Sequence, residues 1–188
     1  TGSANIAIGN NALISNTTGY QNVVVGMNAM YSNKSGASNV AVGRDAMYSS
    51  DSTYNNVAIG YRTMRTNTTG DYNTAVGYQS LYSNTTGFQN TALGYNTLNA
   101  NMWGGNNTAV GNNAMTSNIT GNNSTAVGAS ALYLNVSGTG NQAFGFSAMY
   151  SNKTGNNNTA VGYQAMYSSD STYYNTCLLY TSPSPRDQ

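Results

Sequence analysis

The sequence of 188 residues lacks the side chains on which most enzyme chemistry depends. It has no His, and its five acidic residues are all Asp; only 6% of the residues are charged, against about a quarter in an average globular domain. Without a histidine, a clustered carboxylate pair or a His/Cys metal cage, general acid–base catalysis and metal-assisted hydrolysis have no groups to use. We therefore expect no enzyme activity, no catalytic residue, no cofactor and no metal site.

Charge and hydropathy exclude two further classes of partner. The formal net charge is +1, which gives no basic footprint for nucleic acid. No run of about 18 apolar residues occurs, so we expect no membrane insertion within this segment. The single cysteine, Cys177, excludes an internal disulfide.

What the sequence has instead is a repeat of 17 residues. Glycines recur at this spacing without insertion or deletion from Gly9 to Gly162, in ten copies with the consensus N-T-A-V-G-Y-Q-A-M-Y-S-N-T-T-G-x-N. The fourth residue after each of these glycines is always Leu or Met, as at Leu81 and Met149, and this column is the predicted core. Such strict periodicity indicates a repeat architecture.

The repeat predicts an all-β fold, a parallel β-solenoid or β-roll of ten coils with two short strands in each. The segment N-[VT]-A-[VI]-G has β-branched residues two apart, typical of a short strand, and A-[LM]-Y-S-N fits a second one. Ordering one 17-residue coil costs roughly 25 kcal/mol, far more than its few apolar side chains return, so single coils are unstable and must stack.

The repeat sets the predicted domain boundaries. Residues 1–176 form the array, which we expect to be truncated at both ends. Residues 177–188 contain Cys177 and both prolines and break the register. We expect them to be a non-repeat tail, artefactual or disordered.

Stacking in register places like residues over like. We expect asparagine ladders and a partial tyrosine column at Tyr31, Tyr48, Tyr82, Tyr133, Tyr150 and Tyr167. Both faces of the first strand are small or apolar, with Ala75 and Gly77 on one and Thr74 and Val76 on the other. We expect one face, with the flat Ala/Gly surface as the candidate, to meet neighbouring chains.

N-x-[ST] triplets occur in most coils, and two interpretations stay open. One is glycosylation of a secreted fibre, for which the candidate residues are Asn16, Asn33, Asn67, Asn84, Asn118, Asn135 and Asn152. The other is that Asn and Thr cap a tight turn. Glycans on successive coils would lie only about 4.8 Å apart, which favours turn capping.

Three residues are candidate surface contacts. Trp103 is the only Trp and replaces the usual turn Thr beside two glycines, where it can contact a sugar or a partner protein. Arg62 and Arg65 lie within one coil and form a candidate contact patch. For each, a solvated surface residue without a partner is the alternative.

The segment N-T-A-V-G-Y-Q-[SA], at Asn73 to Ser80 and Asn158 to Ala165, resembles the head repeats of trimeric autotransporter adhesins, whose pattern runs roughly S-V-A-I-G-x-x-A. It is similar also to collar and shaft repeats of phage and large-virus tail fibres. The likeness spans residues 1–176, and the present coil is longer by a T-T-G turn. The resemblance implies a left-handed β-roll, a homotrimer and a role in an attachment fibre.

Three functions remain as hypotheses. The first is a structural or adhesive segment of an extracellular, cell-surface or virion-surface fibre, with itself as partner and a host-surface glycan or protein as ligand. The second is an ice-binding β-solenoid with Thr and Tyr ladders. The third, an enzyme borne on a fibre, is disfavoured because the Asp residues are scattered.

Overall fold

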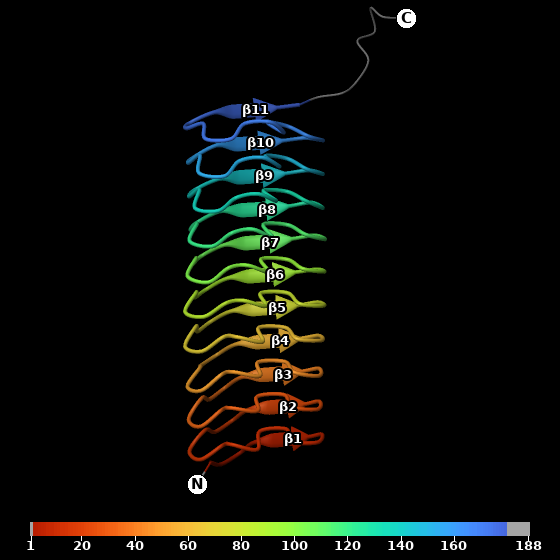
Figure 1. The fold of residues 1–188 in the computed structure, drawn as a ribbon, viewed down its shortest axis with the longest axis vertical. Coiled ribbons are helices and arrows are strands. Elements are labelled where there is room, and N and C mark those ends of the chain that lie inside the picture. Colours follow the sequence, from red (N-terminus) through yellow and green to blue (C-terminus); the bar gives the residue numbers. More distant parts are fainter. Residues whose placement is uncertain (1, 180–188) are drawn as a thin grey trace, which may run out of the picture.

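A computed structural model describes residues 2–179, which form a straight rod of stacked coils (Figure 1). Each coil contributes one strand to a single sheet of eleven parallel strands, in the order β1 to β11. The predicted parallel β-solenoid is therefore confirmed. The strands are β1 (Ile6–Ile8), β2 (Val23–Val25), β3 (Val40–Val42), β4 (Val57–Ile59), β5 (Thr74–Val76), β6 (Thr91–Leu93), β7 (Thr108–Val110), β8 (Thr125–Val127), β9 (Gln142–Phe144), β10 (Thr159–Val161) and β11 (Thr176–Leu178).

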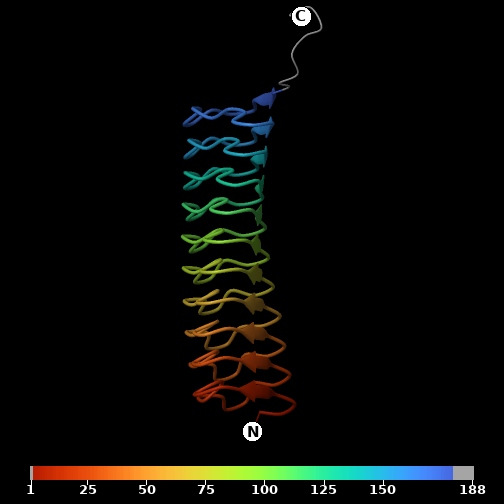
Figure 2. The same cartoon turned by 90° about the vertical axis from the view of Figure 1, so that its right-hand side faces the viewer.

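The register of the sheet is the register of the sequence repeat. Each strand residue pairs with the residue 17 positions later, as Ala75 does with Ala92 and Val76 with Leu93. The strands line one side of the rod and the turn segments line the other (Figure 2). Equivalent residues therefore form columns that run along the rod axis.

Each coil has one strand, not the two that we predicted. The segment predicted as a second strand, residues 80–84 in this coil, is a turn, because Leu81 has a left-handed backbone with a φ of 53°; Gln79, just before the segment, has a φ of 50°. Backbone bonds between coils continue through this turn, with the Leu81 amide donating to the Thr97 carbonyl at 2.9 Å. A left-handed leucine is strained by about 1–2 kcal/mol, and complete burial of its side chain, worth about 1.5–3 kcal/mol, offsets the strain.

The glycine that ends each strand is required by the stacking. Gly77 has a φ of 135°, and a Cβ atom there would collide with the carbonyl oxygen of Gly94 in the next coil. Only a residue without a side chain lets the two turns approach so closely. The invariance of this column in the ten copies has a direct steric cause.

The core is a thin seam inside the coils. Ala75 of β5 and Leu81 behind it are fully buried, as are their equivalents in most coils, so the predicted Leu/Met core column is confirmed. Ser80 is also buried, and its hydroxyl donates to the Ala92 carbonyl at 2.9 Å. The seam is narrow because alanines on the strand face leave room for only one large side chain per coil.

The sheet continues two residues past the predicted boundary at residue 176. In β11, Cys177 pairs with Ala160 and Leu178 pairs with Val161. The backbone groups of β10 template this strand whatever its side chains, and Cys177 is a small residue that replaces alanine on the inner face. The rest of the predicted tail, residues 180–188, lies outside the described residues.

Candidate functional site

The described residues contain neither a pocket nor a metal cluster. Within residues 2–179, no three His, Cys, Asp or Glu side chains come together, and the surface has no cavity. The same residues contain no helix, and hence none long and apolar enough to cross a membrane. Any binding by this part of the chain must therefore take place on an open face or edge of the rod.

Two columns of buried asparagines run through the rod and hold adjacent coils together. In the column before each strand, the Asn90 amide nitrogen of the backbone donates to Asn73 Oδ1 at 3.0 Å, and Asn90 Nδ2 donates to the Gly104 carbonyl at 2.8 Å. In the turn column, Asn84 Nδ2 donates to Asn67 Oδ1 at 2.7 Å and to the Gly87 carbonyl at 2.9 Å. The predicted asparagine ladders are confirmed.

The turn column contains all seven candidate glycosylation residues. Six of them are fully buried: Asn33, Asn67, Asn84, Asn118, Asn135 and Asn152. Their Nδ2 atoms, to which a glycan would attach, donate hydrogen bonds inside the coil. The folded chain has no room for a glycan there, and the turn-capping interpretation accounts for these residues. Asn16, in the first coil, is half-buried, and its Nδ2 donates to the Gly19 carbonyl at 3.1 Å.

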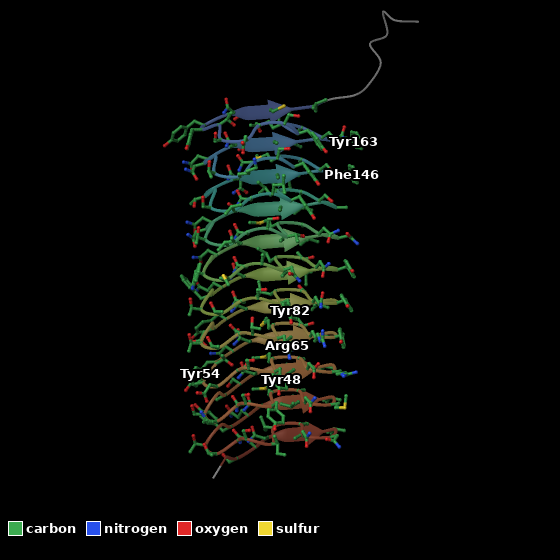
Figure 3. All side chains as sticks on the ribbon, viewed as in Figure 1. Tyr48, Tyr54, Arg65, Tyr82, Phe146 and Tyr163 are labelled. Carbon is green, nitrogen blue, oxygen red and sulfur yellow. The ribbon has the colours of Figure 1, made fainter. Side chains whose placement is uncertain are left out.

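Arg62 and Arg65, the candidate contact patch, each have a partner on the rod itself. Arg62 Nε lies 3.5 Å from Asp45 Oδ2, and its guanidinium lies 4.9 Å from the centre of the Tyr61 ring. Arg65 occupies the tyrosine column and lies 5.0 Å from the Tyr48 ring centre (Figure 3). A planar guanidinium thus takes the place of an aromatic ring in the stack.

The predicted tyrosine column is stacked in two stretches. Tyr31 lies on Tyr48 with ring centres 5.1 Å apart, and Tyr133, Tyr150 and Tyr167 are spaced at 5.0 Å. Burial raises the pKa of Tyr150, and the phenols of Tyr133 and Tyr167 raise it further, because a phenolate there would face two more titrating groups. Stacked pairs of this kind contribute about 0.5–1.5 kcal/mol each.

A second aromatic column, which sequence reasoning missed, follows the strands at one edge of the rod. Tyr61, Tyr78 and Tyr95 stack at 5.3 and 5.1 Å, and Phe146 stacks on Tyr163 at 5.4 Å (Figure 3). The recurrence of aromatic residues directly after the repeat glycine is the sequence signal that could have predicted this column. Both ring faces of Tyr78 are covered by its neighbours, so Tyr78 presents only its ring edge to solvent.

Trp103 lies in the turn segment and belongs to neither aromatic column. It is 53% exposed, and the residues above and below it in the same column, Thr86 and Thr120, are exposed threonines. Its backbone amide donates to the Ile119 carbonyl at 3.0 Å, which fixes the turn. Gly104 and Gly105 follow Trp103. The Phe88 ring lies next to Gly105, because a Cβ atom on Gly105 would be 3.0 Å from the Phe88 ring.

The outward side of the sheet forms a continuous surface, which we call the outer sheet face. It consists of the first and third residues of β1 to β10, such as Thr74 and Val76, which are half-buried or exposed. The Ala/Gly side, which we expected to meet neighbouring chains, is instead inside the coil, where Ala75 is fully buried. The Leu81 side chain needs that flat inner surface, so Thr74 and Val76 face outward.

The outer sheet face carries no charge. Its twenty positions in β1 to β10 hold only Val, Ile, Leu, Phe, Thr and Gln. Parallel sheets in proteins are usually covered on both faces, and large exposed apolar patches mark interaction sites.

Searches against protein-family models, curated proteins and solved structures found no significant match to this chain.

Proposed function

We propose that this chain is a structural and adhesive segment of an extracellular, cell-surface or virion-surface fibre, and that it assembles laterally as a homotrimer through the outer sheet face. The observation that carries the proposal is the outer sheet face, which is uncharged and largely apolar and which nothing in the chain covers within the described residues. Burial of this face against other copies would stabilise the assembly by about 25 cal/mol for each Å² of apolar surface removed from water.

The periodicity of the face favours a second copy of the same chain over an unrelated partner. Side chains recur along the rod at the spacing of parallel strands, about 4.8 Å. Another copy has the same spacing, so ridges and grooves match along the whole length. A globular partner matches them only locally. Three copies around a common axis is the number that the resemblance to trimeric autotransporter heads implies.

The test is the mass of the assembly in solution. Light scattering coupled to size exclusion should give three times the mass of one chain. The double variant Val76→Lys/Val110→Lys places charges on the outer sheet face and should yield folded monomers by circular dichroism. Thr69→Lys/Thr154→Lys, with both changes at exposed turn positions, should leave the mass unchanged. A monomeric parent chain contradicts the proposed assembly.

Ice binding is the second candidate, and one observation favours it. Thr74, Thr91, Thr108, Thr125 and Thr159 form a column on the outer sheet face, interrupted only by Gln142. Regular hydroxyls beside a column of apolar side chains on a flat face can order water. The two functions compete for the same surface, so a thermal-hysteresis measurement on the monomeric and assembled chain separates them. Absence of hysteresis in both states excludes ice binding.

A further inference from the structure

We propose that Trp103 is the platform of a binding site for a neutral sugar, a pyranose of an uncharged glycan. This site goes beyond the proposed lateral assembly and does not require it, because Trp103 lies in a turn segment between β6 and β7 and is not part of the outer sheet face. A monomer therefore carries the same surface.

The first support is the accessible ring of Trp103. A pyranose binds an aromatic residue by laying its C–H face on the ring, so at least one ring face must be open. Tyr78 fails this condition because Tyr61 and Tyr95 cover both of its faces. Trp103 is 53% exposed, and the coils below and above contribute only Thr86 and Thr120 to its column, so neither neighbouring coil stacks an aromatic ring on it.

The second support is the polar and apolar surroundings of the ring. Thr86 and Thr120 are exposed and lie about one coil spacing, roughly 4.8 Å, from the backbone of Trp103, so their hydroxyls are within reach of sugar hydroxyls. Met102, which is 37% exposed, precedes Trp103 and extends the apolar surface. Gly104 follows it and places no side chain beside the ring. An aromatic platform with hydroxyl neighbours suits a ligand that is apolar on one face and polar at its rim.

The third support is the absence of charge. Between Asp71 and Lys153 the sequence has no Lys, Arg, Asp or Glu, and Trp103 lies near the middle of this stretch. The neighbouring turn position holds Met102, Ile119 and Val136 in three successive coils, where other coils hold Thr, Lys or Asp. A charged glycan would find no counter-ion here. The ligand that the surface complements is therefore a neutral one.

The experiment uses the single tryptophan as its own reporter. The chain is titrated with cello-, malto- and chito-oligosaccharides while the Trp fluorescence is recorded, and the same neutral glycans are screened on an array. We expect saturable binding that changes the emission. Trp103→Thr installs the residue found at this position in several other coils, as at Thr86 and Thr120, and should fold normally. It should weaken binding on the array at least tenfold.

Two controls distinguish sugar binding at Trp103 from binding elsewhere on the rod and from chain association. Phe146→Asn removes an exposed aromatic from the column that follows the repeat glycine, where Asn10 and Asn112 occupy the same position, and should leave binding unchanged. Equal binding by Trp103→Thr and the parent chain, or no response to any neutral glycan, overturns the proposal. A loss of assembly mass in Trp103→Thr would assign the surface to chain association instead, and would also overturn it.

Discussion

The side chain of Asn84 occupies the space into which a Cβ atom on Gly87 would project. The same relation holds between Asn33 and Gly36 and in every coil that has this Asn and Gly pair. Two coils have Ser and Thr at these positions, Ser50 with Thr53 and Ser169 with Thr172. In these two coils Ser replaces the Asn and Thr replaces the Gly. The two replacements occur together because a threonine side chain fits only where the asparagine side chain is absent.

The coupling of Ser50 to Thr53 can be measured. Ser50→Asn alone should destabilise the chain by about 1–3 kcal/mol, because the new amide collides with the Thr53 side chain. Adding Thr53→Gly should restore the lost stability, since the new asparagine can then donate to Asn33 Oδ1, which is buried without a partner. Urea denaturation of the parent, both single variants and the double variant completes the cycle. Additive effects of the two changes would contradict the relation.

The turn ladder predicts a cost for removing one asparagine. Asn84→Ala leaves Asn67 Oδ1 and the Gly87 carbonyl without this donor, and Asn101 Nδ2 without one of its two acceptors. Unsatisfied buried groups of this kind cost about 1–3 kcal/mol, which should lower the urea midpoint. Thr86→Ala, at an exposed position of the same turn, is the control and should change the midpoint little. Equal stability of the two variants would show that the ladder contributes nothing.

In the Leu/Met core column, replacing Leu81 by Met should change the stability little, whereas replacing it by Ala should lower the stability strongly. Both Leu and Met occur there in different coils, so Leu81→Met should cost less than about 1.5 kcal/mol. Leu81→Ala removes the one large buried side chain of its coil and should cost about 2–5 kcal/mol. Thermal unfolding followed by circular dichroism measures both. A small effect of the alanine variant would mean that the seam is not the source of stability.

The stacked tyrosines predict a loss of stability at alkaline pH. The pKa of Tyr150 is raised in the folded chain above its usual 10.0, so the folded state holds this proton more tightly than the unfolded state. The contribution of Tyr150 to the free energy of unfolding is complete below pH 10.0 and is lost as the pH rises through the folded-state pKa. Urea midpoints at rising pH should fall less steeply for Tyr150→Phe than for the parent chain. Tyr82→Phe is the control, because its neighbours in the column are Arg65 and Asn99.

The periodicity of the sequence predicted the architecture, but it did not predict the local backbone geometry of the turns. The spacing of Gly9 to Gly162 determined the parallel register, and the Leu/Met column identified the core. The second strand was predicted wrongly because nothing in the residue type of Leu81 signals a left-handed backbone. The orientation of Ala75 was missed because both faces of its strand are small or apolar, so the pattern alone does not say which one turns inward. The burial of Asn84 depends on Gly87, a relation visible only once the turn is built.

Joining successive coils by hydrogen bonds that run along the rod has a mechanical consequence. Tension applied between the two ends loads these bonds one coil after another, so the coils should peel away singly rather than shear together. Each released coil frees 17 residues, which extend to roughly 55–60 Å from an initial rise of about 5 Å. The segment would thus lengthen in uniform steps under pull and recoil coil by coil when the force is removed.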